Sequence, residues 1–205
     1  MDVIRALTEK FSRFPGIGPR QAKRFVYHLL TRSPSDIDEF VTLMQSLKGA
    51  ISVCPSCYKF FTKRHDKSIT CDICLSPNRS KDQLMIVCKD VDLESVEKSD
   101  SYDGYYFVLG GTVPILEKEP ERKVRIKELF QIIENRTSSG LKEIIIATNF
   151  NPEGENTSDY ILSRIKPLTE KFTLKVSTLG RGLSTGTELE YSDKETLRNA
   201  LKNRV

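Results

Sequence analysis

Residues 84–88 read Leu84-Met-Ile-Val-Cys88, a run of five consecutive apolar side chains. A short apolar run of this kind predicts a strand that is buried on both faces. Further strands are predicted at Tyr105–Leu109, Glu143–Thr148 and Phe172–Val176. Strands that are buried on both faces are typical of a parallel sheet covered by helices, so we expect an α/β fold after residue 82.

Helices are predicted between these strands. Apolar residues recur at helical spacing over 122–136, and shorter helices are predicted at 92–97 and 155–165. A last helix, 194–203, follows Ser192-Asp193, either of which is a good N-cap. The alternation of strands and helices predicts a mostly parallel sheet that is flanked by helices.

Three helices are predicted before the sheet. The first two are Val3–Phe11 and Gln21–Leu30, and the third runs from Ser35 or Asp36 to Leu47 and ends at Gly49. Between the first two lies Phe14-Pro-Gly-Ile-Gly-Pro19, which cannot be helical throughout. The chain therefore begins with a helical part that differs in kind from the α/β part.

Four of the five cysteines form two closely spaced pairs, Cys54-Pro-Ser-Cys57 and Cys71-Asp-Ile-Cys74. Two residues between cysteines allow both sulfurs of a pair to face one tetrahedral ion, and four thiolates leave no open coordination position. We therefore expect one structural Zn²⁺ per chain. Two disulfides are the alternative, which a reducing compartment disfavours. The fifth cysteine, Cys88, is interpreted as a buried small apolar residue.

Charge is distributed unevenly along the chain. The net charge is +4, but residues 1–32 carry +5 and residues 82–205 carry −3. A basic first part suggests a surface that binds a polyanion, and an ordinary solvated surface is the alternative. No apolar run is long enough to cross a membrane, and Met1–Leu7 contains no signal core, so we expect a cytoplasmic protein.

The glycine turn at 16–18 is the predicted contact with DNA. Gly16 and Gly18 permit positive φ and let backbone N–H groups approach a phosphate oxygen closely. Arg20, Lys23 and Arg24 lie on the first turns of the following helix, where they can reach flanking phosphates. The pattern is the helix-hairpin-helix signature of proteins that bind the DNA backbone, and an ordinary turn between packed helices is the alternative.

Acidic residues are expected where the strands end. Glu153-Gly-Glu155 follows the third strand and Asp90 follows the first, and together they are a candidate site for a partner or for Mg²⁺. The arrangement looks like the Toprim domain of topoisomerases, primases and certain nucleases. Lys89 stands where that domain has a glutamate, so we expect a Toprim fold that serves as a binding scaffold, and any bound Mg²⁺ is not expected to be catalytic.

Five motifs in this order resemble the RecR family of bacterial recombination mediator proteins. They are Phe14–Pro19, the spaced cysteines, Tyr106–Gly111, Ala147–Asn149 with Glu153–Glu155, and Gly186–Asp193. The resemblance divides the chain into a helix-hairpin-helix domain (1–53), a Cys₄ zinc finger (54–80), a Toprim domain (81–177) and a C-terminal segment (178–205) that resembles a Walker B element. No phosphate-binding Walker A loop is present, so no ATPase is expected.

The resemblance implies a function without enzymatic activity. Such a protein would help a RecO-type partner to load RecA-type recombinase on gapped or single-stranded DNA, with a RecF-type protein as a further partner. Arg20 and Arg24 match DNA-binding positions of the family, which assembles as dimers or ring-like tetramers on the bacterial nucleoid. A Mg²⁺-dependent Toprim nuclease or primase-type enzyme is the alternative, and a zinc adaptor that binds only proteins is a third.

Overall fold

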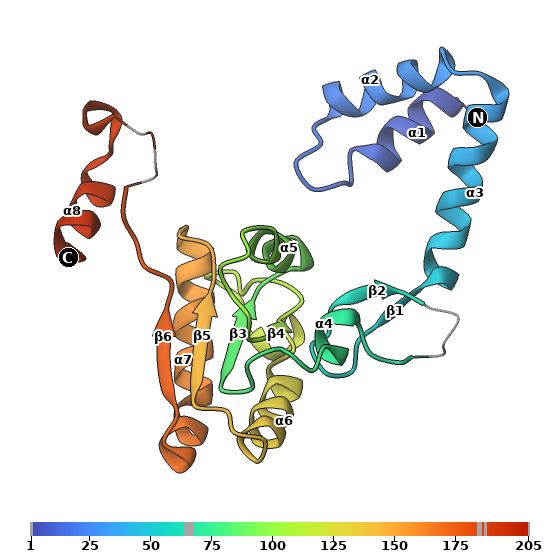
Figure 1. Cartoon of the computed structure of the whole chain (residues 1–205). Coiled ribbons are helices and arrows are strands. Elements are labelled where there is room, and N and C mark those ends of the chain that lie inside the picture. The colour runs from blue at the N-terminus through green and yellow to red at the C-terminus, as the bar shows by residue number, and fades with distance from the viewer. Residues whose placement is uncertain (1, 64–67, 184–185, 187, 205) are drawn as a thin grey trace. The chain divides into compact units, whose positions relative to one another are not determined.

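The computed structural model describes residues 2–63, 68–183, 186 and 188–204. The chain forms two compact units, Met1–Ile51 and Ser52–Val205. The first is helical and is drawn in blue in Figure 1, and the second contains the sheet. No helix in the described ranges has the length and apolarity that crossing a bilayer needs.

The N-terminal unit consists of three helices, α1 (Val3–Phe11), α2 (Pro19–Leu30) and α3 (Pro34–Ala50). Ser33 caps α3, because its side chain accepts the backbone N–H of Asp36 at 3.2 Å. The third helix therefore begins before the predicted Ser35 or Asp36. It also continues past Gly49, where the sequence predicted its end.

Helices α1 and α2 pack through a small apolar contact. The rings of Phe11 and Phe25 meet edge to face with centroids 5.9 Å apart, and Ala22 and Val26 of α2 are buried. No residue of α3 is buried. The N-terminal unit thus has amphipathic helices but a very small core.

The cysteine module (residues 51–80) follows. It contains a two-stranded sheet of β1 (Ile51–Val53) and β2 (Phe60–Thr62) and one helical turn, α4 (Asp72–Leu75). Three of its cysteines and Ile73 are buried in one cluster with residues of the main sheet, so this module shares the core of the sheet.

Four parallel strands form the main sheet in the order β4-β3-β5-β6. The central strand, β3 (Gln83–Val87), pairs with β4 (Tyr105–Val108) and with β5 (Glu143–Ala147), and β5 pairs with β6 (Lys175–Thr178). Every residue of β4 and all of β3 except Gln83 are buried. The uninterrupted apolar runs therefore reflect burial on both faces of the sheet.

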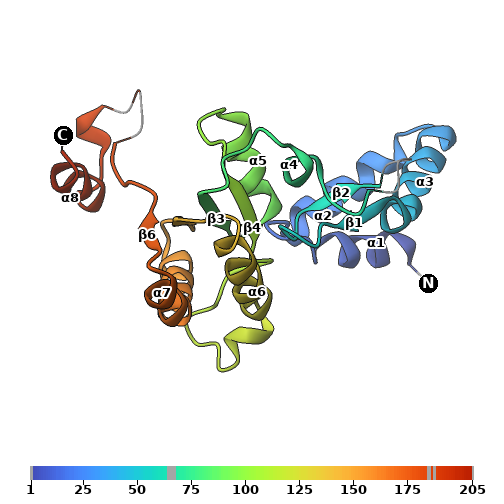
Figure 2. The same ribbon diagram turned by 60° about the horizontal axis from the view of Figure 1, so that its bottom comes forward.

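The two faces of the sheet are covered differently, as Figure 2 shows. Alternate residues such as Leu84 and Phe107 pack in one cluster with α6 (Ile126–Thr137) and α7 (Pro152–Phe172). Their neighbours, including Met85 and Tyr106, pack in a second cluster with Leu93 of α5 (Asp90–Lys98) and with the cysteines. The cysteine module thus takes the place of a further helix on the α5 face.

Further predicted elements have different bounds in the structure, and the largest extension is that of the helix expected at 155–165, which is part of the longer α7. The helix expected at 122–136 is divided into a 3₁₀ turn, η1 (Pro120–Arg122), and α6. The strand expected at 172–176 begins at Lys175, because Phe172 is the last residue of α7. Thr173 has a left-handed conformation (φ 53°) and ends that helix. The C-terminal segment contains η2 (Leu189–Tyr191) and α8 (Lys194–Lys202), which the Asp193 side chain caps.

Candidate metal centre and nucleic-acid interface

Four thiols meet in the cysteine module. The sulfurs of Cys54, Cys57, Cys71 and Cys74 all lie within 4.8 Å of one another, and all four cysteines are free of disulfides. The Sγ atoms of Cys57 and Cys71 are 3.5 Å apart. Sulfurs around a tetrahedral ion with metal–sulfur bonds of about 2.3 Å lie about 3.8 Å apart, so the cluster has the size that a closed Cys₄ metal site requires.

Backbone turns hold the sulfurs in this arrangement. Tyr58 follows the first cysteine pair in a left-handed conformation (φ 62°), and its N–H donates to the Cys54 carbonyl at 2.8 Å. In the second pair, Cys71 is the N-cap of α4 and its N–H donates to the Cys54 sulfur at 3.5 Å. An N–H donor on a sulfur favours the thiolate, which is the form that binds metal.

The thiols also influence one another. The Cys57 thiol, followed by those of Cys71 and Cys74, hydrogen-bonds to Cys54 and lowers the pKa of the Cys54 thiol, although burial opposes this change. Cys88 lies outside the cluster and is completely buried. Burial raises the pKa of Cys88 to about 11, so this thiol stays protonated and acts as a small apolar residue.

Three contacts fix the cysteine module to the main sheet and to α5. The backbone N–H of Val108 in β4 donates to the Cys57 carbonyl at 2.7 Å, and the Tyr58 ring packs against Phe107 with centroids 5.4 Å apart. The third contact involves Asp90, whose carboxylate accepts the backbone N–H of Phe60 at 2.8 Å. Asp90, which the sequence predicts as a partner or cation ligand, connects α5 to β2 in the structure.

The glycine turn lies between α1 and α2. Gly16 has a φ of +76°, as the sequence analysis expected, and a side chain there would be strained. Gly18 has extended backbone (φ −77°, ψ 165°), so of the two glycines only Gly16 uses the positive φ that glycine permits. A Cβ on Gly18 would meet no atom within 4 Å, so the space in front of the turn is open to a bound group.

The predicted DNA contacts are exposed at the start of α2. Arg20, Lys23 and Arg24 are all exposed. The Arg24 guanidinium donates to the Gln21 side chain at 3.4 Å, while the Lys23 ammonium lies 5.8 Å from the Tyr27 ring centroid. Helix α2 has no side-chain cap and no acidic residue in its first turn. Its N-terminus is therefore electropositive and uncovered, as an anion site requires.

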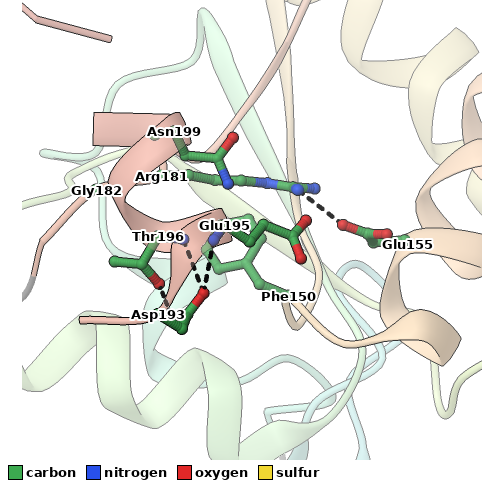
Figure 3. Close-up of a pocket in the computed structure, with 9 residues that line it drawn as sticks. Phe150, Glu155, Arg181, Gly182, Asp193, Glu195, Thr196 and Asn199 are labelled. Carbon is green, nitrogen blue, oxygen red and sulfur yellow. Dashed lines mark hydrogen bonds and ion pairs between the residues drawn. The ribbon is translucent and has the colours of Figure 1, made fainter. Parts of the chain in front are cut away.

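The acidic residues that follow β5 are each engaged within the protein. Glu153 accepts a short hydrogen bond from the Thr112 hydroxyl, and Glu155 pairs with Arg181 at 2.7 Å (Figure 3). Gly154 is required between them, because a Cβ there would collide with the Asn149 carbonyl. Of the residues that the structure describes, the four cysteines are the only group of three or more ligand-type side chains placed to hold a metal ion. That group includes none of Asp90, Glu153 and Glu155, and their assignment to a partner or to Mg²⁺ stays a prediction.

Arg181 is a site residue that was not predicted from the sequence. Its guanidinium lies 4.8 Å from the Phe150 ring centroid as well as pairing with Glu155, and its carbonyl accepts the Asn203 side chain at 2.8 Å. Arg181, Phe150 and Glu155 line a pocket of about 400 Å³ between the C-terminal segment and α7 (Figure 3). A basic residue between two glycines, Gly180-Arg-Gly182, directly after the last strand is the signal that could have indicated it.

Three family models match successive parts of the chain. Family models described as "RecR, helix-hairpin-helix", "Toprim domain" and "RecR, C-terminal" match residues 4–50, 82–179 and 182–205. Curated relatives named "Recombination protein RecR" from Clostridium perfringens, Lactobacillus acidophilus and Lactobacillus helveticus are 35%, 34% and 33% identical over 202 residues, which are 98% of this chain and 96% of each relative. The chain belongs to the RecR family.

Membership of the RecR family confirms the resemblance inferred from the five motifs. The fold class is confirmed as well, since the structure combines N-terminal helices, a cysteine cluster, a parallel Toprim-like sheet and a C-terminal helix. The residues 186 and 188–193 of the last motif are described, whereas Thr187 lies outside the described residues. The division into four domains and the roles of individual site residues stay predictions.

Proposed function

We propose that this RecR-family chain is a DNA-binding recombination mediator with no enzymatic activity of its own. It would form a homodimeric or homotetrameric, ring-like clamp on DNA and help a RecO-type partner, with a RecF-type protein, to load RecA-type recombinase on gapped or single-stranded DNA. This function would place the protein on the bacterial nucleoid. One Zn²⁺ per chain, held by Cys54, Cys57, Cys71 and Cys74, would stabilise the fold.

The observation that carries the proposal is the basic start of α2. Arg20, Lys23 and Arg24 are exposed beside an uncapped helix N-terminus and an open glycine turn. These groups recognise phosphate, and none is placed by a rigid contact that would select a base. We therefore expect binding that is independent of sequence and weakens steeply with salt.

Exposed apolar side chains support self-association. Leu43, Met44 and Leu47 on α3 are 59%, 55% and 61% exposed, although they are large and apolar. Apolar residues grouped on an uncovered helix are typical of a protein interface. A second copy of the chain that covers α3 would give the N-terminal unit the core that it lacks.

The engaged acids support a function without catalysis. Metal-dependent phosphoryl transfer requires carboxylates that are directed at a common ion. Glu155 instead forms an ion pair with Arg181, Asp90 accepts a backbone N–H, and Glu153 accepts the Thr112 hydroxyl. A Toprim sheet with its acids used in this way is better suited to a partner-binding scaffold.

Fluorescence anisotropy with gapped, single-stranded and duplex DNA tests the DNA contact. We expect the Arg20→Ala/Arg24→Ala variant to bind at least about tenfold more weakly and to lower the salt slope by about 2, because each lost phosphate contact lowers it by about 1. The matched control is Arg5→Ala/Lys48→Ala, which removes the same charge from the same unit. Equal binding by the two double variants would exclude the glycine turn as the DNA contact.

Two further measurements separate the mediator from its alternatives. Purified protein should stimulate loading of RecA-type recombinase on gapped DNA that is coated with single-strand-binding protein, when a RecO-type partner is present. No stimulation would contradict the mediator function. Cleavage or synthesis with Mg²⁺ that Glu153→Gln abolishes would instead identify an enzyme.

A further inference from the structure

A second pocket lies at the edge of the sheet opposite Glu153. It has a volume of about 190 Å³ and is formed where the cysteine module meets the N-terminal ends of β3 and β4. Tyr105 is the first residue of β4, and Lys81 lies two residues before Gln83, the first residue of β3. The lining residues are Ser56, Cys74, Lys81, Tyr105, Arg136 and Ser139.

The guanidinium group of Arg136 packs against the Tyr105 ring in this pocket, and its Nε atom has no hydrogen-bond partner among the described residues. Its guanidinium carbon lies 4.0 Å from the Tyr105 ring centroid, the shortest such distance in the described part of the chain. Its Nε atom is buried and has no hydrogen-bond partner among the described residues. A buried N–H without an acceptor is unfavourable, so an acceptor that reached this atom would stabilise the side chain.

The other lining groups match the same ligand. Lys81 is exposed, and within the described ranges neither Lys81 nor Arg136 forms an ion pair. No carboxylate lines the pocket, while Ser56 and Ser139 contribute hydroxyls. A guanidinium, an ammonium and two hydroxyls in one concave site are the donors that bind a phosphate group.

The metal cluster is the competing explanation for these cations, since a zinc ion with four thiolates is dianionic. The Arg136 Nε atom does not donate to Cys74, the cysteine that lines the pocket. Water occupies about 30 Å³ per molecule in the liquid, so the pocket has room for a phosphate group with ordered water. The cations are therefore available to a ligand.

We propose that this pocket binds a phosphate group, and that the phosphate belongs to the backbone of DNA held by the same protein. The second half of the inference rests on the proposed function, and the first half does not. The site would be a second DNA contact, on the Toprim-containing unit, in addition to the glycine turn of the N-terminal unit.

DNA binding by single-charge variants tests the proposal. Lys81→Gln and Arg136→Gln should each weaken binding of gapped DNA about tenfold and lower the salt slope by about 1, because each removes one charge-assisted contact. The matched control, Lys98→Gln on α5, should leave the affinity within about twofold of the unmodified protein. Arg136→Lys keeps the positive charge and should therefore bind DNA more tightly than Arg136→Gln. This comparison distinguishes loss of the charge from a folding defect.

Inorganic phosphate is the probe that does not depend on DNA. The ³¹P resonance of phosphate should broaden with the unmodified protein and not with Lys81→Gln. Broadening together with DNA affinities equal to the control would assign the pocket to a free phosphate compound and overturn DNA as the source. Faster zinc release from Lys81→Gln, with unchanged phosphate and DNA binding, would show that the cations serve the metal cluster and overturn the whole proposal. If the unmodified protein fails to bind DNA, the proposed function fails while the phosphate titration still decides the pocket.

Discussion

The N-terminal unit and the cysteine module differ in how they bury their apolar side chains. Both are too small to build a large core, and both carry apolar residues. The cysteine module buries Cys54, Cys57 and Ile73 in one cluster with the main sheet. The N-terminal unit buries only Ala22 and Val26 among its described residues and leaves the apolar side chains of α3 exposed.

The difference indicates what each part needs for stability. The four cysteines of the cysteine module are grouped closely enough to hold a metal ion, and the module is attached to β4 by a backbone hydrogen bond. The N-terminal unit has neither a group of this kind among its described residues nor a large core of its own. Small units that cannot bury enough apolar area are commonly stabilised by metals or by association, so we expect the first solution for the cysteine module and the second for the N-terminal unit.

Loss of one thiolate should have the largest effect. Cys57→Ser should destabilise the Ser52–Val205 unit by more than about 4 kcal/mol, because it removes the metal and leaves buried polar groups without partners. Metal analysis should fall from one zinc per chain to nearly none, and the thermal unfolding midpoint should fall with it. The control is Cys88→Ser, which should keep the metal. A metal-free chain with an unchanged midpoint would refute the structural role of the cluster.

A matched pair of Leu→Ala substitutions compares the two units directly. Leu84→Ala, at a fully buried position of β3, should cost about 3 kcal/mol of unfolding free energy. Leu43→Ala, at a position that is 59% exposed on α3, should cost less than about 0.5 kcal/mol at low protein concentration. Denaturant unfolding followed by circular dichroism measures both.

In a measurement of self-association, Leu43→Ala should have a larger effect than Leu84→Ala, the reverse of their effects on stability. If α3 is covered by a second copy of the chain, Leu43→Ala lowers the mass of the native assembly in sedimentation, whereas Leu84→Ala does not at temperatures where it is folded. A Leu43→Ala protein that assembles like the unmodified chain would show that this face is not the interface.

The sequence predicted the strands well where burial alone determines them. The runs at residues 84–88 and 105–109 contain no polar residue that competes for another structure, and β3 and β4 lie within one residue of their predicted ends. The strand at 172–176 was placed too early. Phe172 and Leu174 are apolar because they pack on the core at a helix C-terminus, which Thr173 ends in a left-handed conformation.

Contacts between distant residues account for most of what was missed. Helix α6 begins only at Ile126, because the Arg125 backbone N–H donates to Leu109 and its guanidinium donates to Val108. Among the site residues, too, contacts between residues far apart in the chain were not predicted. The four cysteines were predictable because spacing alone brings each pair together, whereas the partner of Glu155, Arg181, lies 26 residues further along the chain and follows no motif.

The smallest expected effects on stability come from removing one ion pair in each unit. Arg79 of the cysteine module donates twice to Glu97 of α5, at 2.6 and 3.0 Å, and the Tyr106 hydroxyl donates to the same carboxylate at 2.6 Å. The pair in the N-terminal unit, Arg5 with Glu9, is 3.1 Å long and has side chains that are 79% and 60% exposed. Only the first pair is shielded from water, so only the first should contribute measurably to stability.

Stability as a function of pH distinguishes the two pairs. Burial alone would raise the pKa of Glu97, but the hydrogen bonds from Arg79 and Tyr106 outweigh it and lower this pKa below its ordinary value. A lowered pKa in the folded state gives stability that is complete above the unfolded value of about 4.3 and is lost as the pH falls through the folded value. Glu97→Gln should therefore cost about 1–2 kcal/mol at pH 7 and progressively less below about pH 4, whereas Glu9→Gln should cost less than about 0.5 kcal/mol at every pH. Thermal unfolding of both variants between pH 3 and 7 measures this difference, and a Glu97→Gln curve that stays parallel to the unmodified protein at low pH would show that the carboxylate charge does not hold the cysteine module to α5.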